Sequence, residues 1–82
     1  MNEVIDIRAK RLAIVLSEST GFDQAANALG TSVADLREQV KDLEGRLCMH
    51  IFEPGGSTPE LTREGRFLIG GFRKAVALVE GQ

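Results

Sequence analysis

The sequence predicts an all-α fold with a small β wing, in which three short helices precede the wing and a long C-terminal helix follows it. Two observations support this prediction. Apolar residues recur at helical spacing in four segments, and short turns rich in glycine, serine or threonine separate the first three. Between the third and fourth segments, a dense run of turn-forming residues follows a short apolar stretch.

The first helix is predicted from about Ile5 to Glu18. Its apolar residues recur near the helical period, at Val4, Ile5, Leu12, Val15 and Leu16. The sequence Ser19-Thr20-Gly21 is typical of a turn, so the helix should end at Glu18.

The second helix is predicted from Phe22 to Leu29. Four apolar residues fall on one of its faces: Phe22, Ala25, Ala26 and Leu29. Because alanine side chains are small, another helix can approach this face closely.

The third helix should begin after the turn Gly30-Thr31. Ser32 offers a hydroxyl N-cap, and Asp35 stands three residues later, where a capping box usually has glutamate. The apolar stripe of this helix consists of Leu36, Val40, Leu43 and Leu47. Two helices joined by a short glycine-containing turn have the outline of a helix-turn-helix.

A two-stranded wing with a loose tip is predicted next. The stretch from Met49 to Phe52 is largely apolar, and the stretch from Glu53 to Pro59 is dense in glycine, proline and serine. Residues 1–60 therefore form the predicted winged helix-turn-helix domain, and residues 61–82 form a separate helical segment.

The last helix should open at Thr62, a plausible N-cap with Glu64 in the first turn, and should run to about Glu80. Along one face it carries Leu68, Phe72, Ala75, Val76 and Val79, and Phe67, Ile69 and Leu78 widen the stripe. This is more apolar surface than a three-helix domain needs. We expect a homodimer through this helix, with Gly70-Gly71 permitting a close crossing; the alternative is that the helix folds back on its own domain.

The composition argues against several other classes of protein. One cysteine, Cys48, and one histidine, His50, are too few for a conventional metal site, and we expect neither a metal nor a cofactor. The same scarcity, with no tyrosine or tryptophan, leaves little from which to build an enzyme active site. No apolar run is long enough to span a membrane and no signal peptide is evident, so a cytoplasmic location is expected.

Four short motifs follow one another along the chain. Residues 22–29 fit the pattern Phe-x-x-Ala-Ala-x-x-Leu, and Ser32 follows. Leu36, Val40 and Leu43-Glu44 fit the pattern apolar-x-x-x-apolar-x-x-Leu-Glu, Ile51-Phe52 occupies a Leu-Phe position, and residues 61–65 read Leu-Thr-x-x-Gly. Over nearly the whole chain, these motifs resemble the N-terminal domain of LysR-type transcriptional regulators, with no insertion or deletion.

This resemblance implies a bacterial, dimeric regulator that binds double-stranded DNA. The third helix would lie in the major groove, the wing would touch the flanking backbone, and the last helix would pair the protomers. Base edges would then be contacted by Ser32, Val33, Ala34 and Arg37, and phosphates by Lys41, Arg63 and Arg66.

The chain departs from the family on this expected DNA surface. Where the family commonly has Gln, Pro and then Ser, it has Val33, Ala34 and Arg37. Val33 cannot make the bidentate adenine contact of glutamine, although it can press on a thymine methyl.

The charges also depart from the family pattern. Wing positions where the family has arginine hold Pro54 and Ser57, a frequently basic position is Glu60, and the net charge is −2. Each lost arginine removes a phosphate contact. The alternative function is therefore a protein-interaction module of the same fold, such as an anti-activator or adaptor that pairs with another regulatory protein.

Overall fold

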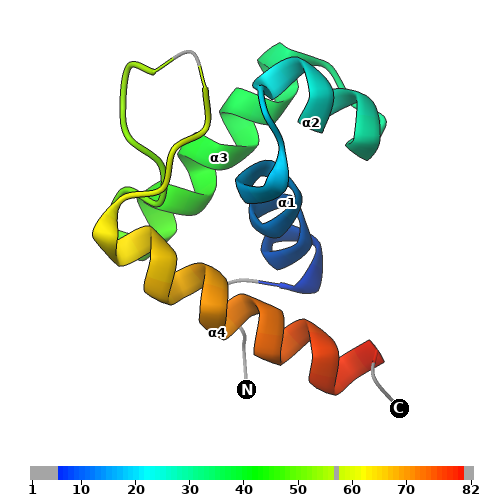
Figure 1. The fold of residues 1–82 in the computed structure, drawn as a ribbon, viewed down its shortest axis with the longest axis vertical. Helices are drawn as coiled ribbons and strands as arrows, with labels where there is room; N and C mark the ends of the chain where they lie inside the picture. Colours follow the sequence, from blue (N-terminus) through cyan, green and yellow to red (C-terminus); the bar gives the residue numbers. More distant parts are fainter. Residues whose placement is uncertain (1–5, 57, 81–82) are drawn as a thin grey trace.

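The computed structural model describes residues 6–56 and 58–80. Along the chain it contains α1 (Ile7–Glu18), α2 (Phe22–Leu29), α3 (Val33–Leu47) and α4 (Arg63–Glu80), with the wing between α3 and α4 (Figure 1). The predicted fold class, all-α with a small β wing, is confirmed. None of these helices has the length and apolar character that crossing a membrane requires.

Side-chain and glycine caps set most of the helix ends. Asp6 is the N-cap of α1, where its carboxylate accepts a hydrogen bond of 2.9 Å from the backbone N–H of Ala9. The helix therefore begins at Ile7 and not at about Ile5, and the predicted contributions of Val4 and Ile5 lie outside the described residues. The αL residue Gly30 ends α2 at Leu29, as predicted.

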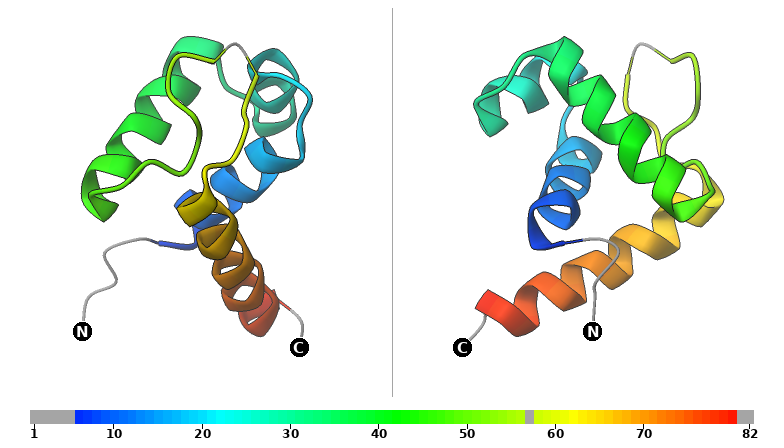
Figure 2. Two further views of the ribbon diagram at one scale, coloured as in Figure 1. Left: turned by 60° about the vertical axis from the view of Figure 1, so that its left-hand side comes forward. Right: turned by 180° about the vertical axis from the view of Figure 1, so that it is seen from behind.

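The core lies where α1, α2 and α3 meet, and two other segments close it. Leu16 of α1, Leu36 of α3 and Ile51 of the wing are its largest fully buried side chains. Ala25 and Ala26 are also buried, as expected for a helix face that a neighbouring helix approaches closely. Views from two further directions show α3 and the wing on one side of α1, with α4 across the base (Figure 2).

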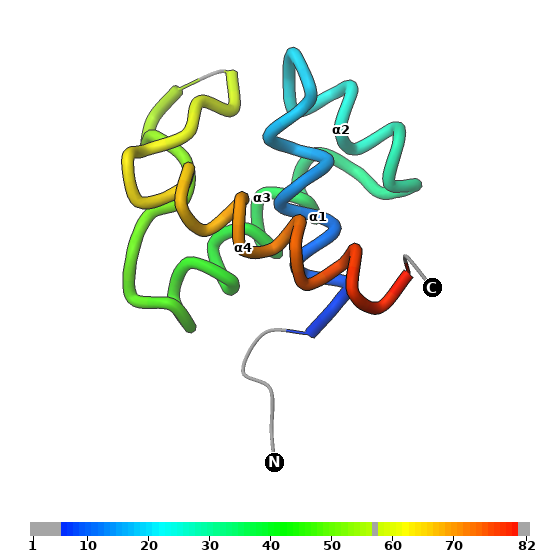
Figure 3. Tube along the Cα trace, turned by 60° about the horizontal axis from the view of Figure 1, so that its bottom comes forward, coloured from blue at the N-terminus to red at the C-terminus, as the bar shows by residue number. Residues whose placement is uncertain are grey.

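α4 folds back onto α1. Ile69 and Phe72 belong to the core, and ion pairs join Arg73 to Glu18 and Arg11 to Glu80. The tube view shows α4 lying across α1 (Figure 3). The predicted apolar residues of α4 therefore fall into two groups, one packed against the domain and one exposed. Apolar residues that span a wide arc of a helix cannot all face the same neighbour.

The wing is smaller than the two strands predicted for it. Within the described residues, a single antiparallel bridge pairs Phe52 with Leu61, and the N–H of Glu53 donates to the carbonyl of Glu60 at 2.7 Å. The next pair in this register would be Pro54 and Pro59. The ladder has already ended there, because the N–H of Glu60 donates to the carbonyl of Thr58 at 3.0 Å and not across to Glu53.

Candidate nucleic-acid interface

The first turn of α3 is capped and open to solvent. The Ser32 hydroxyl accepts a hydrogen bond of 3.1 Å from the N–H of Asp35, so the predicted N-cap is confirmed. Ser32 and Ala34 are exposed, whereas Val33 is half-buried and packs against the core. Of these three residues, Val33 therefore offers the least surface to a ligand.

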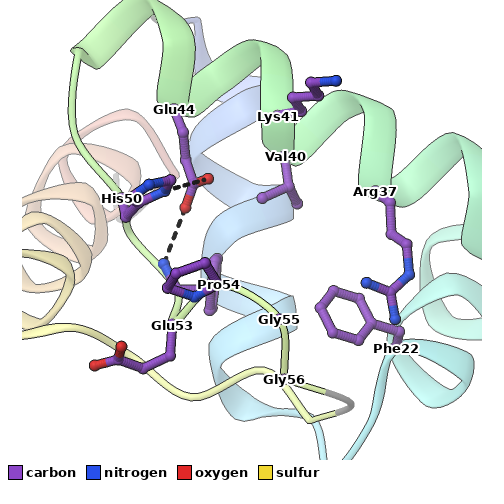
Figure 4. A pocket seen from close by; sticks show the side chains of 11 residues that line it. Phe22, Arg37, Val40, Lys41, Glu44, His50, Glu53, Pro54, Gly55 and Gly56 are labelled. Carbon is purple, nitrogen blue, oxygen red and sulfur yellow. Dashed lines mark hydrogen bonds and ion pairs between the residues drawn. The ribbon is translucent and has the colours of Figure 1, made fainter.

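Two cationic side chains follow on the exposed side of α3, one turn apart. The guanidinium of Arg37 lies over the ring of Phe22 in α2, with 4.1 Å between its Cζ atom and the ring centroid. Lys41 is exposed and extends away from the wing (Figure 4). Farther along, Arg46 is paired with Asp42 at 3.1 Å. We call the exposed side of α3 from Ser32 to Lys41, together with the wing tip, the reading face.

The carboxylates of α3 oppose these cations. Asp35, Glu38 and Asp42 are all exposed, and Glu53 and Glu60 are exposed on the wing. The reading face therefore has mixed charge in the folded structure. Of the two wing positions that lack the family's arginine, Pro54 is exposed, and Ser57 lies outside the described residues.

Glu44 attaches the wing to α3. Its Oε2 atom accepts hydrogen bonds from the N–H groups of Ile51 and Phe52, at 2.7 and 3.0 Å. Its Oε1 atom lies 3.3 Å from Nδ1 of His50. The Glu44 side chain is only 15% exposed, so this carboxylate is a structural anchor and is largely withdrawn from the reading face.

Thr62 attaches the other end of the wing and starts α4. Its hydroxyl donates to the carbonyl of His50 at 2.6 Å and accepts from the N–H of Gly65 at 2.9 Å, which confirms the predicted N-cap. Gly65 is buried against Ile51, where a Cβ would overlap the carbonyl group. We call Glu44, Ile51, Thr62 and Gly65 the junction.

Arg63 and Arg66 stand at the opposite end of α3 from the capped first turn. Both are exposed at the start of α4, which lies beside the C-terminal end of α3 (Figure 1). Since a helix of 15 residues is about 22 Å long, these arginines and Ser32 cannot contact the same phosphate. The predicted DNA-contacting residues therefore form two groups and not one patch.

A solvent-open recess of about 140 Å³ lies between α3 and the wing. Phe22 and Arg37 line one part of it, Glu44 and His50 line another, and the wing residue Gly55 lies between them (Figure 4). Sequence reasoning missed this recess and the role of Phe22 in it. The signal was an aromatic residue at the start of one helix and an arginine in the next, but only the fold brings the two together.

Cys48 ends α3 in a left-handed conformation, with φ of 57°. It is exposed, and its thiol lies 3.7 Å from the carbonyl oxygen of Gly45. Within the part of the chain that the structure describes, no three histidine, cysteine, aspartate or glutamate side chains gather as metal ligands would.

Comparison with known proteins identifies a family. The model of the bacterial regulatory helix-turn-helix proteins of the lysR family matches residues 7–66. Curated protein sequences give no significant match.

Solved structures share the fold over nearly the whole chain. The BenM DNA-binding domain in complex with the catB site 1 DNA is 26% identical, with a TM-score of 0.87, over 94% of this chain and 83% of that one. A full-length OxyR variant from Pseudomonas aeruginosa is 27% identical, with a TM-score of 0.86, over 94% of this chain and 26% of that one. The chain thus spans most of the isolated domain and about a quarter of the full-length regulator.

Proposed function

The chain belongs to the lysR family of bacterial regulatory helix-turn-helix proteins, and from this premise we propose that it binds double-stranded DNA as a dimeric transcriptional regulator. One observation carries the DNA-binding part: α3 presents a capped and exposed first turn in the same fold as a domain solved with its DNA site. The matching family model describes bacterial regulatory proteins.

In this proposal the contacts fall into two groups. Ser32, Val33 and Ala34 approach base edges in the major groove, with Val33 limited to apolar contact with a thymine methyl. Lys41 contacts a nearby phosphate. Arg63 and Arg66 contact phosphates on the flank, because the start of α4 lies at the other end of α3. The acidic side chains on the reading face make phosphate contacts few, so affinity should be modest and strongly dependent on salt.

Binding of the purified protein to mixed-sequence duplex DNA, measured at several salt concentrations, tests this function. We expect binding at low salt and a negative slope of log affinity against log salt. Each phosphate contact should contribute about −0.9 to this slope. Lys41→Gln should lower the slope by about that amount. Arg8→Gln is the matched control, because Arg8 is exposed in the first turn of α1 and belongs to neither α3 nor the wing (Figure 1 shows α1).

Absence of binding even at low salt would contradict the proposed function. It would leave the alternative, a domain of this fold that acts on another protein.

The dimer is proposed to form through the outer face of α4. Phe67, Gly70, Gly71 and Lys74 are all exposed and recur at helical spacing, and Phe67 retains 79% of its surface. A Cβ at Gly70 or Gly71 would meet no described atom within 4 Å, so these glycines leave a notch for a second helix. Of the residues expected at the seam, Val79 is 64% exposed and Leu68, Ala75 and Val76 are half-buried. Phe72 serves the monomer's own core.

Hydrodynamic mass tests the dimer. Phe67→Asp should reduce the mass to that of one chain, because a carboxylate buried at an apolar seam is strongly unfavourable. The monomer itself should remain folded, since Phe67 is exposed in it. Met49→Asp makes a similar change at a residue that is 40% exposed and lies outside α4, and should leave the mass unchanged. A wild-type mass of one chain would contradict the proposal.

A further inference from the structure

The stacked pair Phe22 and Arg37 stands at the edge of the recess between α3 and the wing. The Phe22 ring covers one face of the guanidinium, at 4.1 Å. Arginine donates hydrogen bonds from the edges of its planar group, so stacking leaves those donors available. The close-up view shows the Arg37 side chain directed toward Phe22 at the recess (Figure 4).

Within the described part of the chain, no acidic group neutralises Arg37. Among residues 6–56 and 58–80, no carboxylate forms an ion pair with it, in contrast to Arg46, which is held by Asp42. Glu44, which also lines the recess, is engaged by two backbone N–H groups and by His50. Glu53 directs its carboxylate away from the recess (Figure 4). The recess therefore presents an unpaired cation to whatever enters it.

The recess also has room for an anion. A single water needs roughly 10–15 Å³ in a comparable measure of cavity volume, and the recess offers about 140 Å³. Gly55 and Gly56 bring no side chain into it. A tetrahedral phosphate with part of its hydration shell can be accommodated between the wing and Arg37.

We propose that Phe22 and Arg37 form a preorganised phosphate clamp beside the wing, in which Arg37 binds the nucleic-acid backbone and does not read a base. The inference rests on the proposed DNA-binding function and deepens it. The family resemblance implied that Arg37 lies near base edges with Ser32, Val33 and Ala34. The fold turns its guanidinium onto Phe22 of the neighbouring helix, toward the wing.

Phe22 acts in this clamp as a positioning residue. A free arginine side chain loses much rotamer freedom when it binds a ligand. The ring holds the guanidinium in place before binding, so less freedom remains to be lost. Lys41, one turn farther along α3, adds positive charge nearby without being stacked.

The clamp can be tested without DNA. In an NMR titration of the whole chain with inorganic phosphate, we expect a saturable shift of the Arg37 Nε–H resonance, together with shifts at the Gly55 and Gly56 amides. Phe22→Leu removes the stack and should weaken this response, and Phe22→Tyr, which keeps a ring, should restore it. Absence of a saturable shift at Arg37 would overturn the clamp.

Duplex binding across a salt series supplies the second test. Arg37→Gln should lower the salt slope by about 0.9 and weaken all sequences alike. Arg37→Lys keeps the charge and should keep the slope. Phe22→Leu should also keep the slope, with affinity about two- to fivefold weaker because the cation–π contact is lost. Thermal unfolding of each variant checks that it is folded at the binding temperature.

The outcomes separate the clamp from the proposed function. If Arg37→Gln leaves the slope unchanged and instead removes discrimination at one base pair, Arg37 reads a base and the clamp is overturned. If inorganic phosphate shifts Arg37 but no duplex binds, the anion site stands and the proposed function fails.

Discussion

The junction and the reading face lie side by side but are built under different constraints. At the junction, each side chain touches a particular backbone group: Glu44 accepts from Ile51 and Phe52, and Thr62 binds His50 and Gly65. On the reading face, from Ser32 to Lys41, most side chains meet solvent.

This difference separates the residues that stabilise the fold, at the junction, from the residues that are available for binding, on the reading face. The junction carries the Leu-Glu and Leu-Thr-x-x-Gly motifs of the family, because few residue types can make the contacts found at these positions. The reading face departs from the family at Val33, Ala34 and Arg37, of which Ala34 and Arg37 are exposed. We therefore expect junction substitutions to change stability, and substitutions on the reading face to change binding.

The largest effect is expected at Gly65. In Gly65→Ala, the added Cβ would overlap the carbonyl group of Ile51, and the backbone would have to move. We expect a loss of about 3 kcal/mol in the free energy of unfolding, measured by urea denaturation. Gly45→Ala is the matched control, because its Cβ would meet no described atom within 4 Å; it should stabilise α3 by about 0.5–1 kcal/mol. Equal changes in the free energy of unfolding for both variants would contradict the steric constraint that we infer at Gly65.

Glu44→Ala should have the next largest effect. It leaves the half-buried N–H groups of Ile51 and Phe52 without their acceptor, at a cost of about 2 kcal/mol. Glu44→Gln keeps one acceptor oxygen and should cost less. Glu38→Ala, on the exposed side of the same helix, should stay within about 0.5 kcal/mol of wild type. If urea denaturation gives Glu44→Ala the same free energy of unfolding as wild type, the proposed role of Glu44 as an anchor is wrong.

A charge reversal on the wing should affect binding and leave stability unchanged. Glu53→Lys replaces a carboxylate that repels phosphate, and should raise duplex affinity several-fold at low salt with a steeper salt slope. Glu80→Lys makes the same change in net charge at the far end of α4 (Figure 1). An equal gain in both variants would show that total charge, and not the reading face, governs affinity.

The smallest effect is expected at the end of α3, where Cys48 holds a left-handed conformation with φ of 57°. Glycine adopts this region without steric cost, so Cys48→Gly should stabilise the fold by up to about 1 kcal/mol. Gly30→Ala is the reverse experiment at φ of 69° and should destabilise by about 1 kcal/mol. A destabilised Cys48→Gly, measured by urea denaturation, would mean that the thiol makes a contact worth more than the strain.

Local chemistry explains why much of the fold could be predicted. Ser32 and Thr62 act on residues only three positions away, and Gly30 ends its own helix, so short windows of sequence contain both partners. The wing was overestimated because helical and turn patterns do not show that the N–H of Glu60 bonds to Thr58 and not across the ladder. The contact between Glu44 and the wing spans seven residues and a chain reversal, and helical periodicity carries no information about it.

The sequence by itself determined the order of the described helices, the N-caps of α3 and α4 and the family's motifs, because these depend on side chains that are neighbours along the chain. Tertiary structure alone decided that Phe72 turns into the monomer's own core while Phe67 stays exposed, and that Arg37 stacks on Phe22. The physical reason is that periodicity marks a face of a helix as apolar or charged. Which atoms meet that face depends on how distant segments pack around it.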